Sequence, residues 1–312
     1  MIDFEKVLTR DELTVYTLRA IYAQHGYSQY KMSKFEEYDL YVRNKDFLVS
    51  DNVITFTDTD GRLLALKPDV TLSIIKNNKD NPDALLKAQY NENVYRISGS
   101  THSYKELMQV GLECIGRVGL DEICETVLLA KKSLDAISED NILALSQLDL
   151  VKALIEYASL SEAAEKKVLS SLAQKSGAAI LDAALLDGAD RDKAELIASL
   201  VSVMGNASVI LPTLEKFRVN DKAAMAIDYL KNVTDGLISL GVSDIVIDFS
   251  LVGDMKYYNG IAMKGFINGI PESVITGGQY DRLMAKMGRK SKAVGFAVYL
   301  DALERLPERR GC

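Results

Sequence analysis

Apolar and polar residues follow two different periods along this chain. They alternate near residues 53–66 and 86–116 and again after residue 244, and a period of two is typical of strands. Between about residues 120 and 238, Ala, Leu, Glu, Lys and Ser dominate, and apolar residues recur at helical spacing. The pattern therefore predicts one β-rich unit that is interrupted by helices.

Local signals place the first elements. Thr9, with Glu12 three residues later, forms a capping box that predicts a helix from this point. Residues 53–57 and 63–66 flank a Thr-Asp-Gly turn signal and predict a β-hairpin. Asp69 follows the hairpin and is placed to cap a short helix.

The strands expected after the hairpin lie in two blocks. They are predicted near residues 86–97, 106–116, 244–252, 261–266 and 274–278. Strands in two blocks, joined mostly by hairpins, favour an α+β fold with an antiparallel sheet flanked by helices over a doubly wound fold. The expected domains are a first part of the core, a mainly helical insertion and a second part of the core, at residues 1–120, 121–238 and 239–312.

The composition excludes several classes of protein. The chain has 312 residues, of which 48% are hydrophobic and 26% are charged, which is average for a soluble globular protein. Its net charge of -7 repels polyanions, so we expect no nucleic-acid partner. It contains no run of about 18 apolar residues and no apolar signal region at its start, so we expect no membrane contact and a cytoplasmic location.

Cysteine and histidine are too few to build a metal centre. Cys114, Cys124 and Cys312 lack paired spacing, as expected for reduced thiols, and His25 and His102 add no ligand cluster. No Ser/His/Asp or Cys/His set is present, and the Rossmann and P-loop motifs are absent. The sequence therefore predicts no metal, no cofactor and no hydrolytic centre.

The strand at 106–116 has two unlike faces. One face is an apolar row that is suited to pack under helices, formed by Met108, Val110, Leu112 and Cys114. On the other face, Gly111 lies between Gln109 and Glu113, which leaves room for a small ligand with a cationic or donor group. The alternative is that this face meets solvent.

Other segments offer candidate ligand groups, each with a plainer alternative. Asp69 and Thr71 could hold an ammonium group, although Asp69 could equally serve only as a helix cap. Arg96 could be an anion ligand or a surface cation. Tyr257 and Tyr258 precede an Asn-Gly turn that could hold a ring toward a pocket, or they could simply pack.

Taken in order, six segments resemble the catalytic core of class II aminoacyl-tRNA synthetases, in particular histidyl-tRNA synthetase and its paralogue, the regulatory subunit of ATP phosphoribosyltransferase. They match the strand-turn-strand with the R-P-E-G-T loop, motif 2, the Q-x-G-x-E strand, the histidine-specific loop, a glycine-rich strand and motif 3. These segments are residues 58–71, 94–97, 104–116, 255–260, 277–281 and 293–303. The helical insertion aligns in position only.

Two departures from the family decide which function the resemblance implies. Gly253 stands where the histidine-specific loop has an arginine that contacts the carboxylate and α-phosphate during adenylation. Asp301 and Ala302 stand where motif 3 carries the arginine that holds the ATP γ-phosphate. Because such cations stabilise the transition state of phosphoryl chemistry, efficient adenylation is not expected.

The amino-acid pocket of the family is retained. The resemblance implies that Asp69, Thr71 and Gln109 meet the α-amino group of histidine, and that Glu113 and Tyr258 meet its imidazole. It also implies that Tyr257 and Tyr280 form the pocket wall and that Arg96 is the motif 2 arginine. The expected ligand is therefore L-histidine, although the interface with a partner chain is a second place where it could bind.

The resemblance implies a non-catalytic regulatory subunit. Its partner would be a short-form ATP phosphoribosyltransferase catalytic subunit, which it would activate and make sensitive to histidine in the first step of histidine biosynthesis. The expected assembly is a homodimer core, formed through motif 1 near the first helix, within a hetero-oligomer. No anticodon-binding domain is expected, because the chain stops shortly after motif 3. The alternatives are a stand-alone, adenylate-forming synthetase paralogue and a histidine sensor for another regulator.

Overall fold

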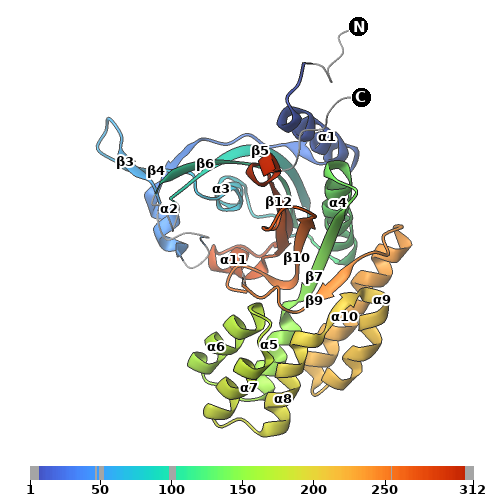
Figure 1. The fold of residues 1–312 in the computed structure, drawn as a ribbon. Coiled ribbons are helices and arrows are strands. Elements are labelled where there is room, and N and C mark those ends of the chain that lie inside the picture. Colours follow the sequence, from blue (N-terminus) through green and yellow to red (C-terminus); the bar gives the residue numbers. More distant parts are fainter. Residues whose placement is uncertain (1–6, 46–47, 49–52, 98–102, 254, 306–312) are drawn as a thin grey trace.

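A nine-stranded sheet forms the centre of the molecule (Figure 1). The computed structural model describes residues 7–45, 48, 53–97, 103–253 and 255–305. The strand order is β1-β5-β6-β12-β11-β10-β7-β9-β8, and every neighbouring pair is antiparallel except β1–β5 and β7–β9. The predicted α+β class with a mainly antiparallel sheet is therefore confirmed.

The strands of the large sheet differ widely in length. Their bounds are β1 Ser28–Gln29, β5 Leu85–Ile97, β6 Tyr104–Gly116, β7 Asn141–Gln147, β8 Met204–Asn206, β9 Val246–Asp248, β10 Asn259–Ile267, β11 Ile275–Gln279 and β12 Lys292–Tyr299. The long hairpin β5–β6 and strand β12 supply the middle of the sheet that carries the site described below.

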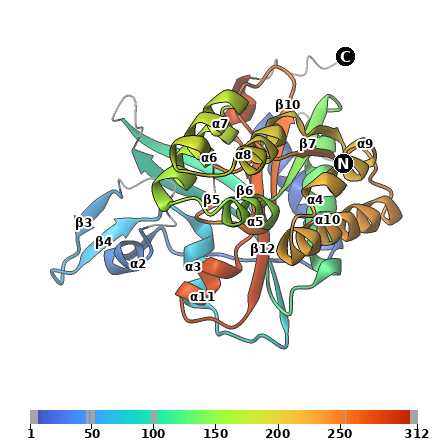
Figure 2. The ribbon, with the colours of Figure 1, turned by 90° about the horizontal axis from the view of Figure 1, so that it is seen from below.

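The predicted hairpin belongs to a separate small sheet. Its strands are β2 Phe35–Glu37, β3 Thr55–Thr57 and β4 Leu63–Leu66, in the order β2-β4-β3. In two views at right angles, β3 and β4 extend away from the rest of the molecule beside helix α2, Tyr38–Arg43 (Figures 1 and 2). The β4 strand leads back to the sheet through Lys67, Pro68 and Asp69, and in this way it positions the start of the next helix.

Helices pack on both faces of the sheet, and the two faces of β6 contribute to two different cores. Helices α1, Arg10–Gln24, and α4, Leu120–Ile137, share a core with Val110, Leu112 and Cys114. Helices α3, Val70–Asn77, and α11, Asp281–Lys286, share a second core with Tyr90 and Ile115. Alternation along β6 therefore directs its odd-numbered residues toward α3, while Val110, Leu112 and Cys114 of the other face pack under helices as the sequence predicts.

The remaining helices form a group at the end of the sheet that carries β7, β9 and β8 (Figure 1). They are α5 Leu148–Tyr157, α6 Glu162–Ala173, α7 Gly177–Leu186, α8 Arg191–Ala198, η3 Ser199–Ser202, α9 Ala207–Ile210, η4 Leu211–Phe217 and α10 Asp221–Ser239, and a further short helix, η5 Asp301–Arg305, follows β12. None of the described helices is long and apolar enough to cross a membrane.

Two expectations about strands need correction. Strand β7 lies within the segment predicted to be mainly helical and pairs with β10, so this part of the segment belongs to the central sheet, as does α4, which packs on it. The strand expected at 244–252 is ordered as β9 only over Val246–Asp248. Short apolar runs such as that of β7 have no period that distinguishes a strand from a buried helix. The division into three domains stays a prediction.

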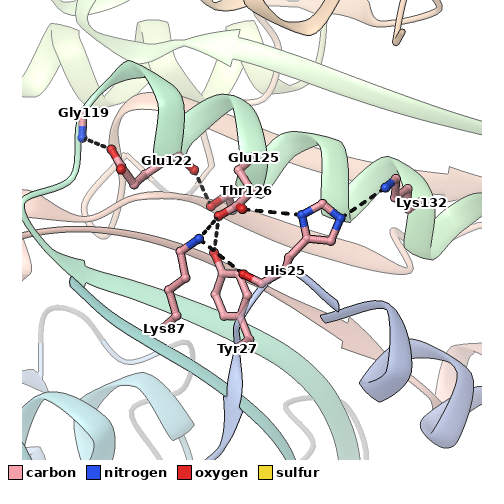
Figure 3. Close-up of polar contacts among 8 residues, drawn as sticks. All are labelled: His25, Tyr27, Lys87, Gly119, Glu122, Glu125, Thr126 and Lys132. Carbon is pink, nitrogen blue, oxygen red and sulfur yellow. Dashed lines mark hydrogen bonds and ion pairs between the residues drawn. The ribbon is translucent and has the colours of Figure 1, made fainter. Parts of the chain in front are cut away.

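Helix α1 begins as predicted and ends in a polar junction. Its capping box is formed by Thr9 and Glu12. Just beyond its end, His25 lies between Glu125 and Lys132 of α4, and Lys87 of β5 reaches the same carboxylate (Figure 3). The junction ties α1, α4 and β5 together on the face of the sheet opposite α3.

Candidate functional site

A cavity of about 570 Å³ lies on the α3 side of the sheet. It is bounded by α3, by β5, β6 and β12, and by the segment that carries Tyr257 and Tyr258. All of the predicted ligand residues line it, namely Asp69, Thr71, Arg96, Gln109, Glu113, Tyr257, Tyr258 and Tyr280. The structure thus brings together residues that lie up to 211 positions apart in the chain (280 − 69), while their contact with a ligand stays a prediction.

Glu113 is the innermost acid of this cavity. Its side chain is almost completely buried. One carboxylate oxygen accepts a hydrogen bond from the Thr71 hydroxyl at 2.6 Å, and the other accepts one from the Tyr280 hydroxyl at 2.5 Å. Burial raises the pKa of Glu113 to about 8, and the negative charge of Asp69 acts in the same direction, although the two hydrogen bonds oppose the rise. Such an acid favours a ligand that brings an N–H donor or a positive charge.

Asp69 combines the two roles that the sequence left open. It is the N-cap of α3, where its carboxylate accepts a hydrogen bond from the backbone N–H of Leu72 at 2.8 Å. It also lines the cavity. Burial raises the pKa of Asp69, while the Leu72 N–H and the positive charge of Arg96 oppose the rise. Capping therefore holds the carboxyl at the cavity wall without removing it from the site.

Arg96 supports the segment that leads into Asp69 and α3. Its guanidinium donates to the backbone carbonyl of Pro68 at 3.3 Å, so it holds the segment that leads into α3. Two more hydrogen bonds link β5 to the segment before Asp69, because the backbone N–H of Tyr95 donates to the Lys67 carbonyl at 2.9 Å and the Lys67 ammonium donates to Glu92 at 2.8 Å. Arg96 also lines the cavity, so it retains access to an anionic group of a ligand.

Gly111 has a different role from the one the sequence suggests. We expected it to leave room for a ligand on the sheet, but the space above it is filled by the ring of Tyr90 from the neighbouring strand. Tyr90 is the register partner of Gly111, and a Cβ at position 111 would lie 2.5 Å from the Tyr90 hydroxyl oxygen. The glycine makes room for this tyrosine and for the backbone carbonyl of Phe296 on β12, whose oxygen would lie closer still to the same Cβ.

Tyr90 is a lining residue that the sequence analysis missed. A usable signal was present, because Tyr90 and Arg96 are six positions apart on one strand and alternation places them on the same face. Strand pairing, which brings Tyr90 over Gly111, could not be read from β5 alone.

Positive side chains gather at the outer part of the cavity. Besides Arg96, the lining includes Lys105, Lys256, Lys264 and Arg305. Arg305 is paired with Glu272 at 2.6 Å. Gly253 and Ala302, the positions where the resemblance implies arginine in the synthetases, also line the cavity and provide no charge. No signal in the sequence had singled out these additional lysines.

The described residues contain no group of three or more His, Cys, Asp or Glu side chains that could hold a metal ion. Cys114 and Cys124 are buried, and burial raises the pKa of both thiols, to about 12 and about 11. His102 and Cys312 lie outside the described residues.

Comparison with known proteins connects this geometry to one family. A family model described as histidyl-tRNA synthetase matches residues 6–303. A protein of Bacillus cereus (strain AH187) named ATP phosphoribosyltransferase regulatory subunit is 29% identical over 292 residues, which is 92% of this chain and 69% of that protein.

Solved structures share the fold. An ATP phosphoribosyltransferase regulatory subunit/histidyl-tRNA synthetase from Bacillus halodurans superimposes with a TM-score of 0.84 at 22% identity, over 98% of this chain and 81% of that chain. A chain of the ATP phosphoribosyl transferase complex from Thermotoga maritima superimposes with a TM-score of 0.71 at 20% identity, over 96% of this chain and 97% of that chain.

Proposed function

Because the chain belongs to the histidyl-tRNA synthetase family, we propose that it is the regulatory subunit of a short-form ATP phosphoribosyltransferase. In this role it is required for the activity of the catalytic subunit and makes that activity sensitive to histidine, in the first step of histidine biosynthesis. The name of the Bacillus cereus relative and the fold shared with the Thermotoga maritima complex support the proposal.

One observation carries the proposal. The inner part of the cavity keeps the groups suited to an amino acid, whereas the positions that hold ATP in the synthetases carry Gly253 and Ala302. A site that binds the amino acid but lacks these cations retains recognition and loses the charge stabilisation that adenylation requires. Such a site is suited to sensing histidine rather than activating it.

Histidine fits the chemistry of the inner part. In this proposal its ammonium group lies near Asp69 and Gln109, and its imidazole lies against Glu113 and Tyr258, with Tyr257 and Tyr280 as the wall. The ring N–H needs an acceptor, and a buried carboxyl without a competing water shell provides a strong one. Thr71 already donates to Glu113, so it acts by orienting that carboxyl as well as by facing the ligand.

The proposed partners are the short catalytic subunit and a second copy of this chain. Helix α1 is the candidate for the contact between copies, since it corresponds to motif 1 and keeps Leu13 and Tyr16 exposed on its surface. The proposal assigns no catalytic residue to this chain.

A reconstitution experiment tests the proposal. The short catalytic subunit encoded in the same genome is assayed for phosphoribosyl transfer from phosphoribosyl pyrophosphate to ATP, with and without this chain, over a histidine titration. We expect activity to appear with the chain and to fall as histidine is added. Activity that is independent of the chain would refute the regulatory role.

A second candidate function is adenylation of histidine without transfer to tRNA. The observation in its favour is the set of cations at the outer part of the cavity, including Lys256 and Lys264. Histidine-dependent exchange of pyrophosphate into ATP measures it directly. Exchange by the chain alone would support this function, and no exchange above the background without histidine would exclude it.

A further inference from the structure

Two polar side chains of the inner cavity form no hydrogen bond with any described residue. They are the amide of Gln109 and the hydroxyl of Tyr90, and both residues are at most 4% exposed. Other buried polar groups at this site are paired, as Thr71 and Tyr280 are with Glu113. Buried polar groups are nearly always paired, so an unpaired one that faces a cavity indicates where a ligand atom binds.

The hydroxyl of Tyr90 lies over Gly111, on the face of β6 that lines the cavity. Gln109, Gly111 and Glu113 follow one another on the same face of β6, about 7 Å apart. A Cβ on Gly111 would lie 2.5 Å from the Tyr90 hydroxyl oxygen and 2.6 Å from the ring carbon that bears it. The hydroxyl therefore lies over position 111, and the neighbouring positions on this face of β6 carry Gln109 and Glu113.

The surroundings of Tyr90 define the kind of atom it meets. The charged groups that act most strongly on it are Glu113 and then Asp69, which are both acids. Burial and these charges raise its pKa well above the ordinary value, so the phenol stays neutral and keeps both a donor and an acceptor. Between two acids, the ligand atom that belongs beside this oxygen is a nitrogen that carries hydrogen.

We propose that Tyr90 is a specificity-determining residue of the amino-acid site, and that its hydroxyl accepts a hydrogen bond from a nitrogen of the bound histidine. This inference rests on the proposed function, because it takes histidine as the ligand of the cavity. Gly111 contributes to this role of Tyr90, since a side chain at position 111 would occupy the space in which the Tyr90 ring lies on the sheet.

Two matched variants of strand β5 test the inference. Tyr90→Phe removes only the hydroxyl at the cavity. Tyr95→Phe removes a hydroxyl on the same strand that donates to Glu106 at 2.9 Å and does not line the cavity. Histidine binding to the full chain is measured by isothermal titration calorimetry, and thermal unfolding without histidine checks the fold of each variant.

We expect Tyr90→Phe to bind histidine about fivefold to twentyfold more weakly than wild type, the effect of one lost hydrogen bond, with thermal unfolding unchanged. Tyr95→Phe should bind as wild type does. A crystal structure of the wild-type chain with histidine provides a check that needs no variant, since a ligand nitrogen should lie within about 3.2 Å of the Tyr90 oxygen.

The outcomes separate the two proposals. If wild type binds histidine and Tyr90→Phe binds it equally well, the role of Tyr90 is refuted while the proposed function stands. The same follows if the ligand nitrogens lie beyond hydrogen-bond reach of Tyr90 in the complex. If wild type does not bind histidine at all, histidine is not the effector of this cavity, and the inference about Tyr90 falls with that part of the proposed function.

Discussion

Glu113 shows how one residue links the site to the stability of the chain. Its pKa is about 8 in the folded protein and 4.5 in its ordinary state. Between these pH values the folded chain holds a proton that the unfolded chain has released. The free energy of unfolding therefore falls as pH rises through this window, and the fold is favoured on the acidic side.

Glu113→Gln should remove this pH dependence. The amide cannot ionise, so the variant should not lose stability as pH rises through this window. The melting temperature of the variant minus that of wild type should therefore be about 3–8 °C higher at pH 8.5 than at pH 5. Thermal unfolding at both pH values measures the gain. Glu106→Gln, on the exposed part of the same strand, is the matched control and should leave the difference unchanged. Parallel pH curves for wild type and Glu113→Gln would contradict the expectation.

Asp69 allows capping and binding to be separated. Asn caps helices about as well as Asp, so Asp69→Asn should leave the free energy of unfolding within about 0.5 kcal/mol of wild type. The variant loses the negative charge, however, and should bind histidine at least about tenfold more weakly. Asp69→Ala should lose binding and also about 1 kcal/mol of stability. Wild-type affinity in Asp69→Asn would show that this residue is only a cap.

At the scale of elements, the junction of α1, α4 and β5 depends on a partly buried ion pair. The Lys87 ammonium lies 2.6 Å from a carboxylate oxygen of Glu125 (Figure 3). The same carboxylate accepts a hydrogen bond from the Tyr27 hydroxyl and contacts the ring of His25. Both partners keep only about a quarter of their side-chain surface exposed. Water therefore screens this pair less than a pair on an open surface.

Replacing the lysine should weaken the junction. Lys87→Met leaves Glu125 without its cation in a partly dry site and should lower the free energy of unfolding by about 1–2 kcal/mol. Urea unfolding measures the change. Lys166→Met breaks a pair of similar geometry with Glu162 on the exposed surface of α6 and should change stability by less than about 0.5 kcal/mol. Equal effects would mean that burial at the junction does not strengthen its pair.

Elements with local signals could be predicted from the sequence, whereas those that depend on pairing could not. The capping box of α1 and the turn of the β3–β4 hairpin fix their elements within a few residues, and the structure confirms both. Strand β7 is bounded by its partner β10, which follows more than 100 residues later, so no local pattern marks it. Alternation within β6 sufficed to predict its cavity-facing residues. The same signal on β5 could have indicated that Tyr90 faces the cavity with Arg96, whereas its position over Gly111 depends on strand pairing.

At the scale of the whole molecule, the cavity joins two distant parts of the chain. One wall comes from α3, β5 and β6, and the other from the segments around Tyr258, Tyr280 and β12. No residue between Glu113 and Gly253 lines it, so helices α6, α7 and α8 contribute nothing to the binding surface. A ligand held between the two walls stabilises both against local opening, because opening of either one loses the contacts.

Hydrogen exchange measured with and without histidine tests this arrangement. Saturating histidine should slow amide exchange in α3 and in β11–β12 together, because both walls must open for the ligand to leave. Exchange in α6 to α8 should stay within error, and these helices provide the internal control. Glu113→Gln, measured at the same histidine concentration, should show less protection in both walls. Protection of only one wall, or equal protection throughout the chain, would place the histidine site elsewhere than between the two parts of the synthetase-like core.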